Sequence, residues 1–264
     1  MARESGFATD KKVVKAEFLD TGQYTDESIS KYERVYGRDF VSPGGIDTAR
    51  EFIQRLDLRS GMRVLDAGCG LGGAAFLMAQ EFGASVTGVD LSANMIRRAD
   101  ARCRSLGLGD RVSFSREDVV KLDFSNEFDV VHSRDVFLHI TDKPTLFATL
   151  HRTLKPGGCL LVTDYCRGDR KSSKEFERYV TERGYDLLDL DGYAARIRQA
   201  GFYNVVAEDL TEQFIAIHHR ELDGLVNKDH GETDLTELIV GWRDKIQRAH
   251  RGEQRWGLFS ALKR

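Results

Sequence analysis

The sequence lacks a long hydrophobic run and an excess of charge of either sign. No segment of its 264 residues approaches the length of a bilayer span, and the charged beginning MARESGFATDKKVVKAEF has no apolar core of signal-peptide length. We therefore expect a soluble, cytoplasmic protein without stable membrane association. The formal net charge is only -3 at pH 7, so no general basic field attracts nucleic acid. A small polar substrate fits this composition better than a nucleic acid does.

Cysteine and proline are also sparse, with four and three residues respectively. Cys69, Cys103, Cys159 and Cys166 form no C-x-x-C pair and lie in segments that we expect to be buried or near a site. This placement argues against a disulfide framework and favours reduced thiols in the cytosol. No group of cysteine, histidine and acidic residues has ligand spacing, so no metal site is predicted.

From about residue 50 the chain alternates short apolar strands with helical stretches, the pattern of a parallel sheet covered on both faces. Apolar spacing and glycine stop signals predict strands at 62–69, 85–90, 111–118, 128–134 and 159–165, and helices at 74–83, 92–107 and 145–158. Segment 166–202 is charged and mostly helical, and we interpret it as an insertion that shapes a site. Strands at 203–210 and 256–263 would close the sheet, with helical tracts of largely solvated polar face at 210–226 and 235–251. One α/β domain over 1–264 is expected.

The first predicted strand runs into a glycine loop that opens a helix. Gly68, Gly70 and Gly72 have the spacing G-x-G-x-G, whereas a dinucleotide fold uses G-x-G-x-x-G to seat a pyrophosphate. Asp66 precedes the first glycine by two residues. A carboxylate there is unfavourable beside a pyrophosphate and favourable beside the ammonium of an amino-acid moiety. The loop therefore favours S-adenosylmethionine over NAD as the cofactor.

Two further acids follow the next strands, where ligands of open α/β sheets bind. Asp90 ends the second predicted strand, where its carboxylate can accept hydrogen bonds from both ribose hydroxyls. Asp118 ends the third and is placed to meet the adenine amino group. The alternative is that the glycines form only a tight turn and that Asp90 caps the following helix.

A candidate base follows the fourth predicted strand. Methyl transfer to an amine needs an aligned nitrogen with a free lone pair, and a histidine suits the removal of its proton. Asp135 and His139 are four residues apart, so on a helix they would share a face, and the acid could orient the ring. Strand alternation points His132 into the packing, and the adjacent His218 and His219 lack ligand spacing.

Several short motifs occur in an order that a glycine loop alone would not specify. They are Gln23–Glu27, Val41–Gly45, Asp66–Gly73, Ser133–Asp135 with His139, Thr163–Cys166, Tyr179 with Arg183 and Tyr185, and Gln254–Gly257. Through them nearly the whole chain resembles the phosphoethanolamine N-methyltransferases of parasites, nematodes and plants. The resemblance implies a Rossmann-like seven-stranded class I methyltransferase sheet flanked by helices. It divides the chain into an N-terminal helical lid (1–48), a cofactor-binding core (49–165) and substrate-binding helices with the closing strands (166–264).

The resemblance also implies an activity and a set of site residues. Methyl groups would pass from S-adenosylmethionine to the amine of phosphoethanolamine or its mono- and dimethyl forms, leading to phosphocholine, with S-adenosylhomocysteine as the other product. The catalytic residues would be Tyr24 and His139, with Gln23 and Asp135 beside them. The cofactor would contact Val41, Ser42, Asp66, Gly68, Gly70, Asp90, Leu91, Asp118, Val119, Ser133 and Arg134. The phosphate would be held by Tyr165, Tyr179, Arg183, Tyr185 and Lys245, a combination of bidentate, point-charge and phenolic donors.

The chain departs from the family pattern mildly. It carries one methyltransferase domain, whereas plant members have two and nematode members can have a second, degenerate half. Val41 and Val119 stand where some relatives have isoleucine, and we expect a monomer. Without the resemblance, Tyr24 is an ordinary packing residue, and Arg183 and Lys245 are solvated helix charges.

Three rival functions stay open from the sequence. The first is another small-molecule methyltransferase, acting on glycine, a sterol or a carboxylate, which would not need the phosphate-binding set. The second is a cofactor-binding regulatory protein without catalysis, and the third is an NAD dehydrogenase.

Overall fold

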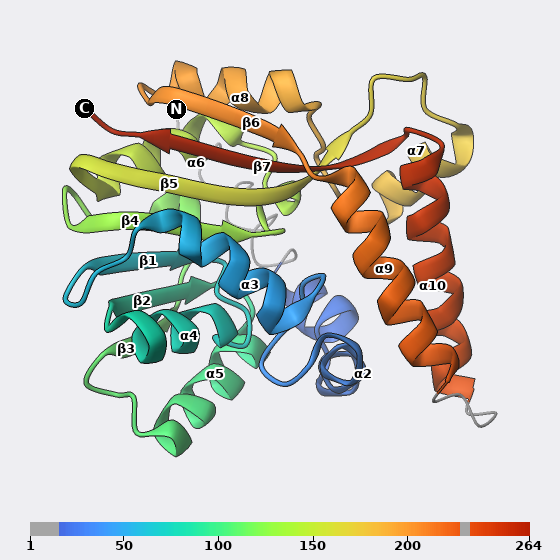
Figure 1. Ribbon diagram of the computed structural model, residues 1–264, viewed down its shortest axis with the longest axis horizontal. Helices are drawn as coiled ribbons and strands as arrows, with labels where there is room; N and C mark the ends of the chain where they lie inside the picture. Colours follow the sequence, from blue (N-terminus) through green and yellow to red (C-terminus); the bar gives the residue numbers. More distant parts are fainter. Residues whose placement is uncertain (1–15, 228–232) are drawn as a thin grey trace, which may run out of the picture.

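The computed structural model describes residues 16–227 and 233–264, and the strands of this part form one mixed sheet (Figure 1). Its order is β3-β2-β1-β4-β5-β7-β6. The parallel members are β1 (Arg63–Ala67), β2 (Ser85–Asp90), β3 (Val112–Arg116), β4 (Phe128–Arg134) and β5 (Leu154–Arg167). Strand β7 (Gln254–Leu262) runs antiparallel between β5 and β6 (Tyr203–Asp209). The predicted seven-stranded α/β sheet is confirmed.

Helices cover both faces of this sheet, which explains why the central strands β1 and β4 are buried at nearly every residue. The helices α3 (Gly45–Ile53), α4 (Gly73–Phe82) and α5 (Ala93–Leu106) lie in front of it in Figure 1, and α6 (Lys143–Thr153) and α8 (Leu190–Gln199) lie behind. On β1, the buried side chain of Val64 belongs to one hydrophobic cluster, and that of its neighbour Leu65 belongs to the other. Adjacent residues of one strand therefore fill opposite layers.

The remaining helices gather beyond the carboxyl ends of the strands. They are α2 (Asp26–Tyr36), α7 (Lys174–Glu182), α9 (Thr211–Val226) and α10 (Thr233–His250), with α9 and α10 side by side at the right of Figure 1. Short turns complete the set: η1 (Leu19–Gln23), η2 (Gln54–Leu56), η3 (Val119–Lys121) and η4 (Phe137–His139). The helical connections predicted after β5 and after β6 are both present.

One predicted boundary is wrong. The helix expected at 145–158 ends at Thr153, and the Lys-Pro-Gly-Gly segment that was interpreted as its stop signal belongs to β5. Leu154 is fully buried and pairs with Phe128, and the register then shifts before Cys159 pairs with Val130. A bulge of this kind accommodates a proline, which cannot donate to a strand ladder.

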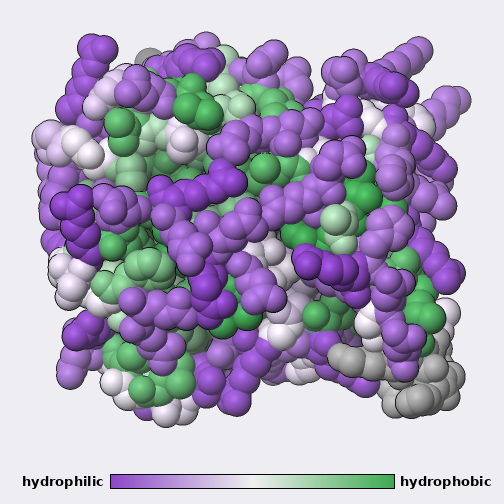
Figure 2. All heavy atoms as spheres, in the orientation of Figure 1, coloured by the Kyte–Doolittle hydropathy of each residue, from purple (hydrophilic) through white to green (hydrophobic). Residues whose placement is uncertain are grey.

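Hydrophilic side chains cover most of the face shown in Figure 2, with hydrophobic ones visible between them. None of the helices within 16–227 and 233–264 is both long and apolar enough to cross a membrane. All four cysteines are free.

Candidate active site

A cavity of about 750 Å³ opens at the carboxyl ends of β1, β2, β4 and β5, between these strands and the helical elements η1, α2 and α10. With one exception, all the residues predicted from the sequence for catalysis, cofactor binding and phosphate binding line it. The exception is Ser133, which is fully buried and donates a hydrogen bond of 2.6 Å to the carbonyl oxygen of Ala67. Segments far apart in the chain therefore meet in a single cavity.

The glycine loop forms one end of the cavity. Gly68 and Gly70 have φ angles of 81° and 53°, the left-handed region that favours glycine. A Cβ on Gly68 would lie 2.4 Å from the side chain of Val136, so this glycine is also required for close packing. The Gly70 amide donates to Asp90 Oδ2 at 2.9 Å, and the Ser92 amide donates to Asp90 Oδ1 at 2.9 Å. Burial raises the pKa of Asp90 to about 6, against the lowering effect of these two amides.

Asp66 has a partner that the sequence did not predict. His132 Nδ1 lies 2.8 Å from Asp66 Oδ1, and both side chains are buried. Asp66 Oδ2 and His132 Nε2 have no hydrogen-bond partner among the described residues. His132 is packed inside the protein, as expected, with 1% of its surface exposed, but it also lines the cavity, which the sequence did not indicate. Asp66 is therefore oriented by a histidine.

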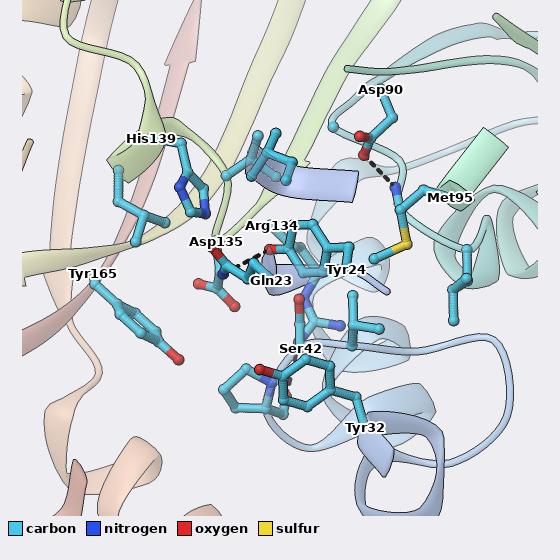
Figure 3. A pocket seen from close by; sticks show the side chains of 18 of the residues that line it. Gln23, Tyr24, Tyr32, Ser42, Asp90, Met95, Arg134, Asp135, His139 and Tyr165 are labelled. Atoms are coloured by element: carbon cyan, nitrogen blue, oxygen red, sulfur yellow. Dashed lines mark hydrogen bonds between the residues drawn. The ribbon is translucent and has the colours of Figure 1, made fainter. Parts of the chain in front are cut away.

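Gln23, Tyr24, Asp135 and His139 meet in the middle of the cavity (Figure 3). Gln23 Nε2 donates to the Tyr24 hydroxyl at 3.2 Å, and Gln23 Oε1 is buried without a hydrogen-bond partner among the described residues. Burial raises the pKa of the Tyr24 phenol above its ordinary value. The phenol is therefore a neutral group that can donate or relay a proton.

The helical face expected for Asp135 and His139 is not formed. Asp135 has a left-handed φ of 57° and precedes the short turn η4 rather than sitting on a helix with His139. Its Oδ1 accepts hydrogen bonds from Trp256 Nε1 at 2.8 Å and from Thr163 Oγ1 at 3.2 Å. Its Oδ2 is buried and has no such partner among the described residues. One oxygen is thus fixed by the protein, and the other is left for a ligand.

Opposing effects act on the pKa of the Asp135 carboxyl group. Burial raises the pKa of its carboxyl group above the ordinary value, and the nearby Arg134 guanidinium opposes this, as do the two hydrogen bonds to Oδ1. Arg134 donates to the carbonyl oxygens of Pro43 and Gly45 and thereby ties β4 to the loop before α3. Ser42 of that loop also lines the cavity.

Aromatic and cationic side chains line the end of the cavity away from the glycine loop. Tyr165 comes from β5, Tyr179 from α7, and Arg183 and Tyr185 from the segment that follows α7. The His139 ring packs edge-on against Tyr185, with 5.1 Å between the ring centroids. This end therefore adjoins the group around Tyr24 and His139.

Lys245 reaches the same end from α10. Its Nζ donates to the Tyr36 hydroxyl at 3.2 Å and lies 4.1 Å from the centroid of the Trp242 ring. Burial lowers the pKa of Lys245 to about 8, although the Glu221 carboxylate acts in the opposite direction. Arg248, one turn further on, is 8% exposed and lies 3.8 Å above the Tyr179 ring. The polar face of α10 is thus partly buried, contrary to the solvated face that was expected.

Sequence reasoning missed several residues that line the cavity: Tyr32, Tyr36, His132, Trp242 and Arg248. A signal was present, because Tyr32 and Tyr36 are four apart on α2 and Trp242 precedes Lys245 by three on α10. The local pattern did not indicate that these faces of α2 and α10 line the same cavity. Within the described residues, no group of histidine, cysteine and acidic side chains is arranged to hold a metal ion.

Comparison with known proteins adds to this geometry. A family described as "Methyltransferase domain" matches residues 58–209. Phosphoethanolamine N-methyltransferase from Plasmodium falciparum is 34% identical over 93% of this chain and 95% of its own length. The chain belongs to the phosphoethanolamine N-methyltransferase family.

Plant and nematode members of the phosphoethanolamine N-methyltransferase family are longer than this chain. Phosphoethanolamine N-methyltransferase 3 from Arabidopsis thaliana is 46% identical over 92% of this chain, which spans 51% of that relative. The chain thus spans about half the length of the plant relatives it matches. A solved structure of phosphoethanolamine N-methyltransferase 2 from Haemonchus contortus, in complex with phosphomonomethylethanolamine and S-adenosylhomocysteine, superposes with a TM-score of 0.91. It is 35% identical, and the match covers 94% of this chain and 60% of that one.

Proposed function

We propose that the protein transfers methyl groups from S-adenosylmethionine to the amine nitrogen of phosphoethanolamine and/or its mono- and dimethyl forms. Successive transfers of this kind lead to phosphocholine. The observation that carries the proposal is Asp135 Oδ2, which has no hydrogen-bond partner within 16–227 and 233–264 and lies in one cavity with the glycine loop and the cations Arg183 and Lys245. A ligand with an ammonium group and a phosphate group matches this arrangement of charges. The similar Haemonchus contortus structure is described as a complex with such a phosphobase, phosphomonomethylethanolamine.

The residues at the glycine end fit S-adenosylmethionine. Asp66 Oδ2, which has no hydrogen-bond partner in the described part of the chain, suits an amino-acid ammonium, and Asp90 would accept hydrogen bonds from the ribose hydroxyls. The space beside Gly70 is open, since a Cβ built there would have only Val41 within 4 Å, at 3.5 Å. A ligand can therefore approach the backbone closely at this glycine. Val119 and Asp118 line the same end for the adenine. When bound, the cofactor would supply an electrophilic methyl group.

The chain's own residues would then hold the amine and remove its proton. Asp135 Oδ2 and Gln23 Oε1 can both accept hydrogen bonds from the ammonium of the substrate. The Tyr24 phenol, neutral because burial raises its pKa, would relay a proton toward His139 rather than act as a standing anion. Closure over the amine would exclude water and align the nitrogen for in-line displacement.

The other end would anchor the phosphate. Arg183 offers a fork of donors, Lys245 a point charge, and Tyr165, Tyr179 and Tyr185 phenolic hydrogen bonds. Tyrosine faces can in addition attract the methylated ammonium by cation–π interaction. An anchor remote from the reacting nitrogen raises turnover, because it restricts the poses of the amine.

The division of the chain is part of the same proposal. Residues 1–48 would form the lid, 49–165 the cofactor-binding core, and 166–264 the substrate helices and closing strands of a single domain. Residues 1–15 of the lid lie outside the described residues. A cytoplasmic monomer that does not bind nucleic acid remains the prediction for the protein's location and assembly.

The test is incubation with labelled S-adenosylmethionine and each of phosphoethanolamine, its monomethyl form and its dimethyl form, with glycine in a parallel reaction, followed by separation of the products. We expect label in the next methylated phosphobase for at least one of the three. Label in glycine, with none in any phosphobase, would establish the rival methyltransferase. Cofactor binding without transfer to any acceptor would favour the regulatory protein.

A further inference from the structure

The turn that carries Tyr24 has a second attachment, on the side away from the substrate. Residues Leu19–Gln23 form the π-helical turn η1, and the Tyr24 amide donates to the Leu19 carbonyl at its end. π-Helical turns are rare, and they occur frequently at functional sites. While Gln23 and Tyr24 face the cavity, Asp20 of the same turn reaches the N-terminus of α5.

The Asp20 carboxylate accepts three hydrogen bonds from the start of α5. Ser92 Oγ donates to it at 2.5 Å, the Ala93 amide at 3.1 Å and the Asn94 amide at 3.3 Å. A carboxylate is favoured there, because the first amides of a helix have no partner within the helix and the helix dipole is positive at this end. Arg116, at 3.8 Å from Asp20 Oδ2, adds a weaker attraction.

Asn94 closes the attachment from the other side. Its Nδ2 donates to the backbone carbonyl of Asp20 at 3.1 Å and to that of Tyr24 at 3.0 Å. One side chain therefore holds both ends of the turn. The Tyr24 ring packs against the cluster of Ile29, Leu71 and Met95, the last of which is on α5 itself.

The same few residues connect this attachment to the cofactor end of the cavity. Ser92 donates its hydroxyl to Asp20 and its amide to Asp90, the acid that we assign to the ribose. The position of Tyr24 is therefore set relative to the loop Asp90–Asn94, which would also hold the cofactor.

We propose that Asp20 and Asn94 are positioning residues that fix Tyr24 over the bound cofactor, with the N-terminus of α5 as their anchor. The proposal rests on the proposed function for the role of Tyr24, but not for the attachment itself. The attachment would favour the closed position of the turn, in which the Tyr24 hydroxyl meets the amine. Weakening it lowers the population of competent enzyme and hence kcat.

The test compares Asp20→Asn with Asp26→Asn. Asparagine at position 20 keeps the shape of the side chain but removes the charge and turns an amide NH₂ toward donors. The control changes an exposed acid of α2 that pairs with Arg97 and Arg98 of the same helix α5. Exposed salt bridges of this kind contribute little to stability. We expect Asp20→Asn to lower kcat roughly tenfold to a hundredfold, the range for lost hydrogen bonds to a charged group, and Asp26→Asn to leave kcat near wild type.

A second comparison separates positioning from general structural damage. In a Tyr24→Phe background Asp20→Asn should lower kcat little further, because the residue it positions is already inactive. Equal losses from Asp20→Asn in the wild-type and Tyr24→Phe backgrounds would overturn the proposal. So would a kcat of wild-type size in Asp20→Asn, or in Asn94→Ala.

Hydrogen–deuterium exchange provides a readout that does not depend on turnover. With adenosylhomocysteine bound, amides 19–24 should exchange faster in Asp20→Asn than in wild type or Asp26→Asn. Unchanged exchange in Asp20→Asn would overturn the attachment. If wild type methylates no phosphobase, the proposed function fails, and the exchange comparison still decides whether Asp20 holds the turn.

Discussion

Replacing Asp135 by asparagine should lower activity and keep or increase stability. Trp256 and Thr163 both donate to Oδ1, which an amide carbonyl can replace. Oδ2, which has no partner among the residues that the structure describes, would become an NH₂ group facing the substrate ammonium. A hydrogen bond to a charged group contributes about 1.5–3 kcal/mol, so kcat/KM for phosphoethanolamine should fall roughly ten- to a hundredfold.

The stability effect has the opposite sign. Burial raises the pKa of Asp135 above its unfolded value, so the stability that the acid contributes is present at low pH and is lost as pH rises through the folded pKa. Above the pKa of an unfolded aspartate, folding therefore costs the wild type free energy, either to bury the charge or to bind a proton, and Asp135→Asn avoids this cost. The melting temperature of the variant should equal or exceed that of wild type at about pH 7, and the difference should shrink toward about pH 4, where an ordinary aspartate is half protonated.

Asp164→Asn is the matched control. Asp164 is fully buried on β5 and does not line the cavity, and its oxygens accept from the Tyr165 amide and the Tyr193 hydroxyl, each at 3.0 Å. Its replacement should leave turnover close to wild type. The assay is steady-state methylation together with thermal melts at the two pH values. Wild-type turnover in Asp135→Asn, or a melting temperature that falls most at about pH 7, would refute the reasoning.

Three further predictions concern the cofactor, the proton relay and the phosphate. Asp90→Ala should weaken S-adenosylmethionine binding by about 1–3 kcal/mol in calorimetry, and wild-type affinity should fall as pH drops through the Asp90 pKa of about 6; unchanged affinity would refute the assignment. Tyr24→Phe and His139→Ala should each lower kcat roughly a hundredfold or more with cofactor affinity retained, and the double variant should be little worse than the worse single one; fully multiplicative losses would indicate separate roles. The inhibition constant of phosphocholine, which has no titrating amine, should rise as pH passes the Lys245 pKa of about 8, because the lysine then loses its charge. In Lys245→Ala this rise should be absent, and its persistence there would assign it to another group.

The sheet was predictable because its signals are local. Apolar runs separated by amphipathic helices, and a glycine loop directly after the first strand, carry their information within about 30 residues. The error at Leu154–Gly158 has the same origin, since Pro-Gly-Gly ends a helix by local rules, whereas the pairing of Leu154 with Phe128 is set by the neighbouring strand.

Most of the residues predicted for the site line the cavity, but the contacts among them were not predictable. Asp66 and His132 meet because β1 and β4 are neighbours in the sheet, and Trp256 reaches Asp135 because β7 is inserted beside β5. These pairs are 66 and 121 residues apart. Periodicity within one segment cannot show such contacts, nor that a face of α10 bearing Lys245 is turned inward.

The most direct test of the central claim compares acceptors with and without phosphate. Without a phosphate to neutralise them, Arg183 and Lys245 would be left as partly desolvated cations, so free ethanolamine should be a very poor substrate beside phosphoethanolamine. Arg183→Ala should lower kcat/KM on every phosphobase, and Arg183→Lys should restore the charge but not the forked geometry. The measurement is steady-state methylation of the paired acceptors by wild type and these two variants. A strong preference for phosphoethanolamine that Arg183→Ala abolishes is the predicted result; comparable rates on both acceptors, or variants indifferent to the phosphate, would contradict the account.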